Sequence, residues 1–357
     1  MRYSWLAVFI VALVSGLTSF KIFDDEIRFI PADDKNIQYT GRIDFTDPKK
    51  PRFWTAGVYI QAKFTGTSCE IIVNDEERGG GHNYLVVAID NGTPFKIKTT
   101  SLSNTLTVAE SLSPGEHTIT ICKNTEALVG YMEFIGFRCN GLVSMPAKPK
   151  RKMEFIGNSI TSGSESDLSQ FPCDSGKWYD RHNAYFSYGP MVARQMNAQW
   201  HLTSDSGIGL VHSCCKKKYL MPQVFDNISL SEDSIPWDFK SYQPDVVTIC
   251  LGQNDGIQDS IKFATSYIDF IKTIRGYYSK ALIICLTSPM ANDKLRGVMK
   301  NYINGIVNRV NKLGDKRVDK FFFSRAFNNG CGGHPDIKDH VLIAEELSGF
   351  VKKKMRW

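Results

Sequence analysis

A serine in a glycine turn and a histidine in a glycine-rich loop are residues whose types and settings suit acyl transfer. Ser159 follows the apolar run Met153–Gly157, and His334 stands between Gly333 and Pro335. A serine at the exit of a strand can attack a carbonyl while neighbouring backbone N–H groups point toward the same place. Taken alone, Ser159 also fits an ordinary helix N-cap, and a loop histidine needs no chemical role.

A second polar segment follows the most apolar run of the chain. The run Asp245–Gly252 reads DVVTICLG, and Gln253, Asn254 and Asp255 come directly after it. Glycine lets a substrate approach the backbone, and the Asn254 amide can donate to a developing oxyanion. The same segment fits an Asx turn that ends a strand. A nucleophile, an oxyanion donor and a base nevertheless arrive in order at predicted strand ends, which together favour acyl-transfer chemistry.

The chain before residue 148 predicts a β-sandwich. Apolar and polar residues alternate over Val58–Phe64, which is the period of a half-buried strand. Tyr84–Ile89, the segment around Ile119 and the run Tyr131–Cys139 supply further strands. Because no helical pattern separates them, we expect a jelly-roll-like sandwich over residues 20–147.

Residues 148–357 change to an alternation of strands and helices, after a linker rich in proline and lysine around Met145–Lys152. This rhythm predicts a three-layer α/β/α fold with a parallel sheet, whose ligands bind at the carboxyl ends of the strands. The expected strands are Met153–Gly157, Gln199–Thr203, Asp245–Gly252, Ala281–Ser288 and Lys320–Ser324, and the expected helices are Ala184–Asn197, Ile261–Ser279, Lys294–Leu313 and Ile337–Met355.

Four segments of this second half resemble the sequence blocks of SGNH (GDSL) hydrolases, in the family's order. Gly157-Asn-Ser-Ile160 is similar to the G-D-S-I block and Ser206-Gly-Ile-Gly209 to the second block. Gly252-Gln-Asn-Asp255 is similar to the G-x-N-D block, and His334-Pro335 to the closing histidine-proline pair. The resemblance runs from Met153 to the C-terminus and implies the α/β/α domain of that superfamily.

A sandwich placed before such a domain resembles carbohydrate esterase family 2. The segments Gly41-Arg-Ile-Asp-Phe45 and Ala62-Lys-Phe-Thr-Gly-Thr67 are similar to that family's N-terminal domain. The resemblance implies a carboxylic ester hydrolase that removes acetyl groups from polysaccharides such as xylan and mannan. An acetylated polysaccharide or oligosaccharide is therefore the expected partner.

The resemblance also implies a role for each matching residue. Ser159 would be the nucleophile and His334 its general base. The oxyanion hole would consist of the backbone N–H groups of Ser159 and Gly207 and the side chain of Asn254. No metal and no organic cofactor are expected.

Two positions depart from the family pattern. Asn158 stands where the family has aspartate, which removes a charge but keeps the turn. The residues three and two positions before His334 are Cys331 and Gly332, so neither place holds the acid of a triad. Two arrangements remain open: a Ser–His dyad oriented by a backbone carbonyl, or an acid from elsewhere. The nearby candidates for such an acid are Asp255, Asp336 and Asp339.

The N-terminus has the form of a secretory signal peptide. Arg2 precedes the apolar run Trp5–Leu13, and small residues follow it. We expect residues 1–19 to be removed, which leaves no membrane segment and places the protein outside the cell or in the periplasm. An uncleaved N-terminal anchor is the alternative.

Charge and cysteine content exclude other classes. The net charge is +6, and apart from Lys148–Lys152 and Lys216–Lys218 the lysines are scattered, so solvated surface charge is favoured over nucleic-acid binding. The nine cysteines show no zinc spacing and no disulfide-scaffold pattern. Cys250 and Cys285 lie in apolar runs and predict buried thiols, and the adjacent Cys214 and Cys215 are not expected to pair with each other.

The leading hypothesis is a secreted serine esterase that deacetylates polysaccharides. Its rivals are a lipase or thioesterase on the same scaffold and a catalytically impaired carbohydrate-binding relative. Trp178, Tyr179 and Trp237 are aromatic residues that either stack on sugar rings or only pack. His340 is expected to pack within the last helix rather than act as the base. The oligomeric state is left open by the sequence.

Overall fold

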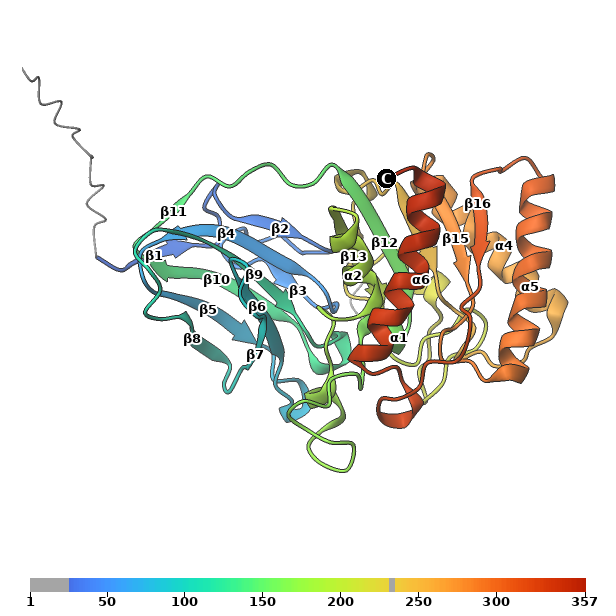
Figure 1. Cartoon of the computed structure of the whole chain (residues 1–357), viewed down its shortest axis with the longest axis horizontal. Coiled ribbons are helices and arrows are strands. Elements are labelled where there is room, and N and C mark those ends of the chain that lie inside the picture. The colour runs from blue at the N-terminus through green and yellow to red at the C-terminus, as the bar shows by residue number, and fades with distance from the viewer. Residues whose placement is uncertain (1–25, 231–234) are drawn as a thin grey trace, which may run out of the picture.

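The computed structural model describes residues 26–230 and 235–357. The predicted signal peptide, residues 1–19, lies outside the described residues. Figure 1 shows two halves side by side: antiparallel strands from the N-terminal part of the chain and a parallel sheet with helices from the C-terminal part. No described helix is both long enough and apolar enough to cross a membrane.

Two antiparallel sheets form the N-terminal sandwich. The first has the order β1 (Arg28–Pro31), β10 (Met132–Cys139), β5 (Cys69–Asp75) and β8 (Ser103–Ala109), with β3 (Arg52–Phe53) also beside β10. The second has the order β11 (Gly141–Val143), β4 (Tyr59–Thr65), β9 (Glu116–Lys123), β6 (Tyr84–Ile89) and β7 (Phe95–Lys98), with β2 (Gln38–Thr40) also beside β4.

Strand alternation produces the core of the sandwich. Along β5, buried residues alternate with half-buried ones, so Ile71 and Val73 point inward. They share one hydrophobic cluster with Phe64 of β4 and Phe134 of β10. Burying a side chain of this size stabilises the fold by about 1.5–3 kcal/mol. The predicted sandwich is therefore confirmed, and β4 begins one residue later than the alternation indicated.

The C-terminal half is built on a five-stranded parallel sheet, as predicted. Its order is β13 (Ala198–Ser204), β12 (Arg151–Gly157), β14 (Val246–Ile249), β15 (Leu282–Leu286) and β16 (Val318–Phe321). β12 is buried from Met153 onward, as strands covered on both faces are. The last strand lies slightly earlier than the predicted Lys320–Ser324.

Helices cover both faces of this sheet. α2 (Tyr188–Gln195) and α6 (Ile337–Met355) share a hydrophobic core with Met153 and Phe155 of β12. α4 (Ser260–Tyr277) and α5 (Asp293–Lys312) share a second core with Ile156. The predicted helix Ala184–Asn197 begins only at α2, because Ser187 has extended backbone and acts as the N-cap.

The halves meet through aromatic packing and a buried ion pair. Tyr59 of the sandwich stacks on Trp200 of β13 with ring centroids 3.9 Å apart. Arg42 of the sandwich donates to Glu154 of β12 at 3.0 Å, and both side chains are fully buried. Removing one partner would leave an uncompensated buried charge, which typically costs about 3–5 kcal/mol. The contact therefore fixes the two halves against each other.

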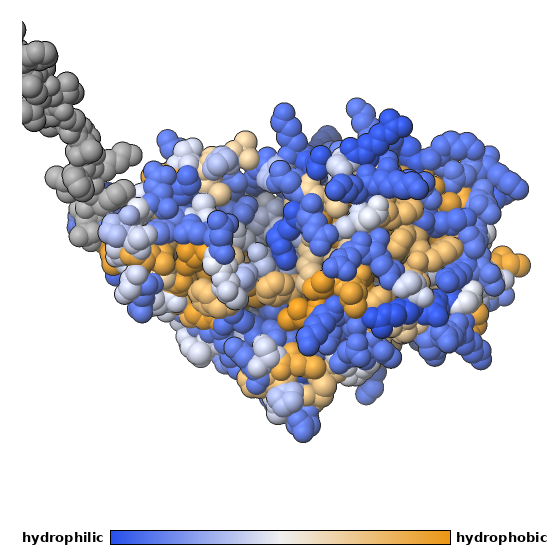
Figure 2. All heavy atoms as spheres, viewed as in Figure 1, coloured by the Kyte–Doolittle hydropathy of each residue, from blue (hydrophilic) through white to orange (hydrophobic). Residues whose placement is uncertain are grey.

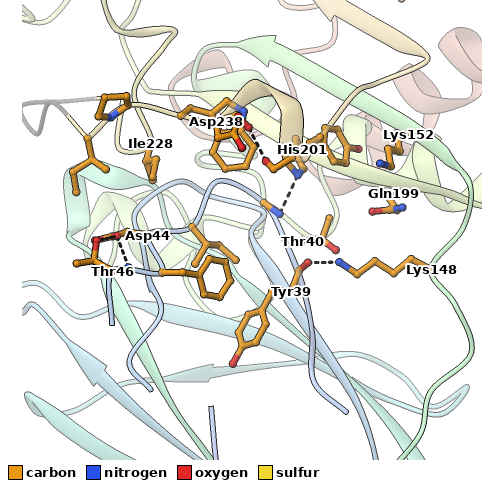
Figure 3. A pocket seen from close by; sticks show the side chains of 18 residues that line it. Tyr39, Thr40, Asp44, Thr46, Lys148, Lys152, Gln199, His201, Ile228 and Asp238 are labelled. Carbon is orange, nitrogen blue, oxygen red and sulfur yellow. Dashed lines mark hydrogen bonds between the residues drawn. The ribbon is translucent and has the colours of Figure 1, made fainter. Parts of the chain in front are cut away.

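A cavity of about 560 Å³ lies at this junction, beside the amino end of β12. We call it the junction cavity. Figure 3 shows Lys148, Lys152 and Gln199 together on one side of it and Asp44 and Thr46 on the other. Burial, together with the charge of Lys152, lowers the pKa of Lys148 to about 8.

Candidate active site

The turn after β12 presents Ser159 at the carboxyl end of the parallel sheet. α1 (Ser159–Ser162) begins at this serine, and Asn158 Oδ1 caps it by accepting from the Ile160 N–H at 3.2 Å. A Cβ on Gly157 would lie 2.1 Å from Thr161 Oγ1, so the turn requires a glycine there. Asn158 thus keeps the turn without a charge.

His334 lies beside Ser159. Its Nε2 lies 2.9 Å from Ser159 Oγ, and its Nδ1 lies 3.1 Å from the Cys331 carbonyl oxygen. A carbonyl only accepts, so the proton of a neutral imidazole belongs on Nδ1, and the Nε2 lone pair faces the serine hydroxyl. Burial lowers the pKa of His334, which favours this neutral form.

The three candidate orienting acids have other partners. Asp255 accepts from the backbone N–H groups of residues 210–212. Asp336 caps α6 by accepting from Asp339 N, and Asp339 accepts from Asn329. Within the described part of the chain, the group that faces Nδ1 of His334 is a backbone carbonyl. Of the two arrangements left open by the sequence, this geometry matches the one in which a backbone carbonyl faces the histidine.

A disulfide ties down the segment that carries this carbonyl. Cys331 is bonded to Cys173, 158 residues away in sequence. Cys331 N also donates to the Glu165 carbonyl at 3.2 Å. The residue whose carbonyl orients His334 is therefore held by a disulfide to Cys173 and by a hydrogen bond to Glu165.

Gly207 and Asn254 reach the same cleft. Gly207 has φ +79°, a left-handed conformation that favours glycine. Asn254 Nδ2 donates to the Ile208 carbonyl at 2.8 Å, which fixes the amide plane and leaves its second N–H to point elsewhere. Ser159, Gly207, Asn254 and His334 all line one pocket of about 740 Å³, which we call the Ser159 cleft.

Comparisons with known proteins show the family to which the chain belongs. The family profile described as "Carbohydrate esterase 2 N-terminal" matches residues 39–149. A solved family two carbohydrate esterase from Clostridium thermocellum, in complex with cellohexaose, is 31% identical with a TM-score of 0.83, over 90% of this chain and 99% of that one. The chain belongs to carbohydrate esterase family 2.

Curated relatives agree with this membership. The "Cellulase/esterase CelE" of Acetivibrio thermocellus is 32% identical over 344 residues, which are 91% of this chain but 40% of that protein. An "Acetylxylan esterase / glucomannan deacetylase" of Cellvibrio japonicus is 26% identical over 92% of this chain and 91% of its own length. This carbohydrate esterase family 2 member therefore matches less than half of CelE and nearly all of the second relative.

The sandwich supplies a residue to the site that sequence reasoning missed. Glu126 is fully buried, and its carboxylate accepts from Ser206 N at 2.7 Å and contacts His182 Nε2 at 3.0 Å. Ser206 directly precedes Gly207, so this carboxylate holds the segment that carries Gly207 from the other half of the molecule. Burial raises the pKa of Glu126. The hydrogen bond to His182, the charge of His182 and the hydrogen bonds from Ser206 outweigh it and lower the pKa below its ordinary value. Glu126 lies in no motif, so only the tertiary contact reveals it.

Of the three aromatic candidates, two line a cavity and Tyr179 lines neither of the two described above. Trp178 lines the Ser159 cleft, at the start of the short helix Trp178–Arg181, and is 38% exposed. Trp237 lines the junction cavity instead. His340 is buried and accepts from Tyr188 N at 3.2 Å, so it packs as expected.

The cysteine expectations are partly wrong. Cys250 and Cys285 are buried free thiols, as predicted. Cys214 and Cys215, which were expected not to pair, are bonded to each other. The expectation failed because the intervening backbone adopts a tight turn in which Cys215 has φ +62°. This pair lines the Ser159 cleft.

Proposed function

We propose that this chain is a carbohydrate O-acetyl esterase in which Ser159 is the nucleophile and His334 the general base. The observation that carries the proposal is the 2.9 Å contact between His334 Nε2 and Ser159 Oγ, inside a cleft that Gly207 and Asn254 also line. Family membership supports an ester hydrolase, and the cleft supports the residue roles.

Acylation begins when His334 Nε2 takes the Ser159 hydroxyl proton as Oγ attacks the acetyl carbonyl carbon. The carbonyl oxygen becomes an oxyanion, which the N–H groups of Ser159 and Gly207 and the Asn254 amide stabilise. The Cys331 carbonyl accepts from Nδ1–H throughout and so stabilises the imidazolium. The tetrahedral intermediate then collapses, the bond to the sugar oxygen breaks, and His334 returns the proton to that oxygen.

Deacylation repeats these steps with water. His334 Nε2 takes a proton from a water molecule, whose oxygen attacks the acetyl carbon of the ester on Ser159. The same donors stabilise the second oxyanion. The intermediate collapses, the bond between the acetyl carbon and Ser159 Oγ breaks, and Oγ takes the proton from His334. Acetic acid leaves the cleft and ionises to acetate in solvent. Preorganised oxyanion donors of this kind each contribute about 3–4 kcal/mol to such a barrier.

The substrate we propose is an acetylated polysaccharide or oligosaccharide, met outside the cell or in the periplasm. Two observations support this location. The relatives named above are described as a cellulase/esterase and as an acetylxylan esterase / glucomannan deacetylase, and polymers of this size are met outside the cytoplasm. The Cys173–Cys331 disulfide requires an oxidising compartment to persist. Trp178, at the rim of the cleft, provides an exposed ring on which a sugar can stack.

The decisive test is acetate release from acetylated xylan and acetylated glucomannan, together with hydrolysis of 4-nitrophenyl acetate. We expect activity in the wild-type chain and a loss on the order of 10⁴–10⁶-fold in Ser159→Ala. Ser279→Ala, the same change at an exposed position after α4, is the matched control and should retain wild-type rates.

Two outcomes would reject the proposal. An inactive wild type that still binds glycans would indicate a binding protein, and an active Ser159→Ala variant would remove the nucleophile. Comparing acetyl with octanoyl esters separates a lipase, which should prefer the longer chain. An acetyl esterase should lose most of its kcat/KM on the octanoyl ester.

A further inference from the structure

One wall of the Ser159 cleft is a short cationic loop, Cys214–Lys218, which we call the lysine loop. All five of its residues line the cleft together with Ser159 and His334. In the sequence, Lys216–Lys218 had only the interpretation of solvated surface charge. The structure places these charges at the opening of a candidate active site instead.

The backbone of the lysine loop is anchored on the oxyanion glycine. Cys214 N donates to the Gly207 carbonyl at 2.8 Å, and Lys217 N donates to the Cys214 carbonyl at 3.1 Å. The Cys214–Cys215 bond closes the turn, and Lys216 has φ +64°. Lysine side chains on this loop therefore start from a fixed position beside the place where the oxyanion would form.

Two of the charges in the cleft wall are already neutralised. Lys217 Nζ contacts the buried Asp205 carboxylate and donates to Tyr219 Oη at 2.9 Å. Glu165, the acidic residue that lines the cleft, is paired with Arg181. Neither of these pairs adds net charge to the cleft.

Lys216 and Lys218 differ from Lys217. Both are exposed, and among residues 26–230 and 235–357 no carboxylate lies within the 4.0 Å ion-pair limit of either ammonium group. The opening of the cleft therefore carries about two uncompensated positive charges beside the reacting centre. Charges at the rim of a cleft raise the local concentration of ligands of opposite sign.

We propose that Lys216 and Lys218 form a subsite for the carboxylate of a uronic acid residue in an acetylated polysaccharide. This inference rests on the proposed function, because the lysines act on a glycan that is bound at Ser159. A lysine ammonium is a flexible point charge, so it can meet a sugar carboxylate without a fixed hydrogen-bond geometry. The subsite would make acidic acetylated glycans better ligands than neutral ones of the same length.

The test measures competitive inhibition of 4-nitrophenyl acetate hydrolysis by pure oligosaccharides. One arm uses a xylo-oligosaccharide that carries a uronic acid side group, and a second uses the unsubstituted xylo-oligosaccharide of equal backbone length. A third arm uses an oligogalacturonide, which separates a uronate in a side group from a uronate in the main chain. At low ionic strength, we expect the acidic xylo-oligosaccharide to have a Ki about three- to tenfold lower than the neutral one.

Lys216→Gln/Lys218→Gln should bring the Ki ratio of the acidic and neutral oligosaccharides to about one. Salt at about 0.5 M should have the same effect on the wild type, because the Debye length then falls well below 10 Å. Lys352→Gln/Lys353→Gln is the matched control. It removes the same charge from the exposed C-terminal turn of α6, which Figure 1 places away from the carboxyl ends of the strands. This control should keep the wild-type ratio.

Three results would each overturn the subsite. The wild type could have equal Ki values for the acidic and neutral xylo-oligosaccharides, or neither oligosaccharide could inhibit. The Ki ratio could also stay unchanged in Lys216→Gln/Lys218→Gln. Loss of the ratio in the α6 control would also overturn it, because net charge alone would then be the cause. Failure of the proposed function has a different signature, which is the absence of 4-nitrophenyl acetate hydrolysis in the wild-type chain.

Discussion

The Ser159 cleft and the junction cavity each contain a histidine and flanking lysines, but His334 is half-buried, His201 is buried, and the two side chains have different partners. His334 has its Nε2 directed at a serine hydroxyl and its Nδ1 directed at a carbonyl. His201 accepts from Gly41 N through Nε2 at 3.1 Å and stacks on Tyr242 with ring centroids 3.5 Å apart. The first imidazole has the contacts that the proposed general base needs, and the second joins the two halves through its bond to Gly41.

Burial and a lowered pKa therefore do not by themselves identify a catalytic histidine. Burial lowers the pKa of both groups, and in His201 the charges of Arg42, Lys148 and Lys152 add to it. The two sites differ in the group that faces the Nε2 lone pair. In His334 this group is the Ser159 hydroxyl, and in His201 it is the backbone N–H of Gly41. Figure 2 shows that the face seen in Figure 1 is mostly hydrophilic, with hydrophobic residues scattered over both halves.

The largest effect after loss of Ser159 is expected from the oxyanion side of the cleft. Asn254→Ala removes a donor and also frees the Ile208 carbonyl. We expect kcat on acetyl esters to fall by about 10²–10³-fold with a much smaller change in KM, because the lost interaction forms mainly in the transition state. Steady-state kinetics with 4-nitrophenyl acetate check this, and a change confined to KM would contradict the assignment.

The next largest loss of activity is expected from a residue of the sandwich, Glu126. Glu126→Ala removes the acceptor for Ser206 N and should lower kcat by about 10–100-fold, as loss of supporting groups behind a reactive centre typically does. Glu126→Gln retains one carbonyl oxygen that can accept from Ser206 N, so it should recover much of this loss. If the two variants are equally impaired while equally stable in thermal unfolding, Glu126 does not act through that backbone N–H.

The pH dependence of the cleft gives a third comparison. His334 must be neutral to accept the serine proton, so kcat/KM should rise with pH and reach a plateau above its pKa. Burial lowers that pKa, so the midpoint should lie below the ordinary value of about 6.5. A pH profile with a neutral acetyl ester measures it. A midpoint above about 7 would show that the cleft favours the imidazolium instead.

The smallest effect on activity is expected in the junction cavity. His201→Gln should leave kcat/KM unchanged but lower the free energy of unfolding by about 1–3 kcal/mol, through loss of the stacking and hydrogen bond. Because the folded state lowers the pKa of His201, wild type loses this group's contribution as pH falls below about 6.5. Denaturant unfolding should therefore show the two proteins converging in acid. A loss of activity at full stability would move His201 into the reaction.

Much of the fold followed from local pattern. The strands β6 and β12 and the helix α6 lie where alternation, continuous apolar runs and helical spacing indicated. The errors occur at element ends, where capping decides the boundary, as at Ser187 before α2. Cys214 and Cys215 show the same limit, because a backbone turn with positive φ is not visible in residue types.

Residue type and chain order alone determined which side chains could do chemistry: a serine after one strand, an amide after another and a histidine before the last helix. Parallel strands bring their carboxyl ends to one edge, so those residues had to share a face of the sheet. The group that faces Nδ1 of His334 depends on tertiary contacts, because the Cys331 carbonyl is a backbone group that every residue type carries. The same holds for Glu126 and the lysine loop, whose positions depend on contacts across the two halves and around a tight turn.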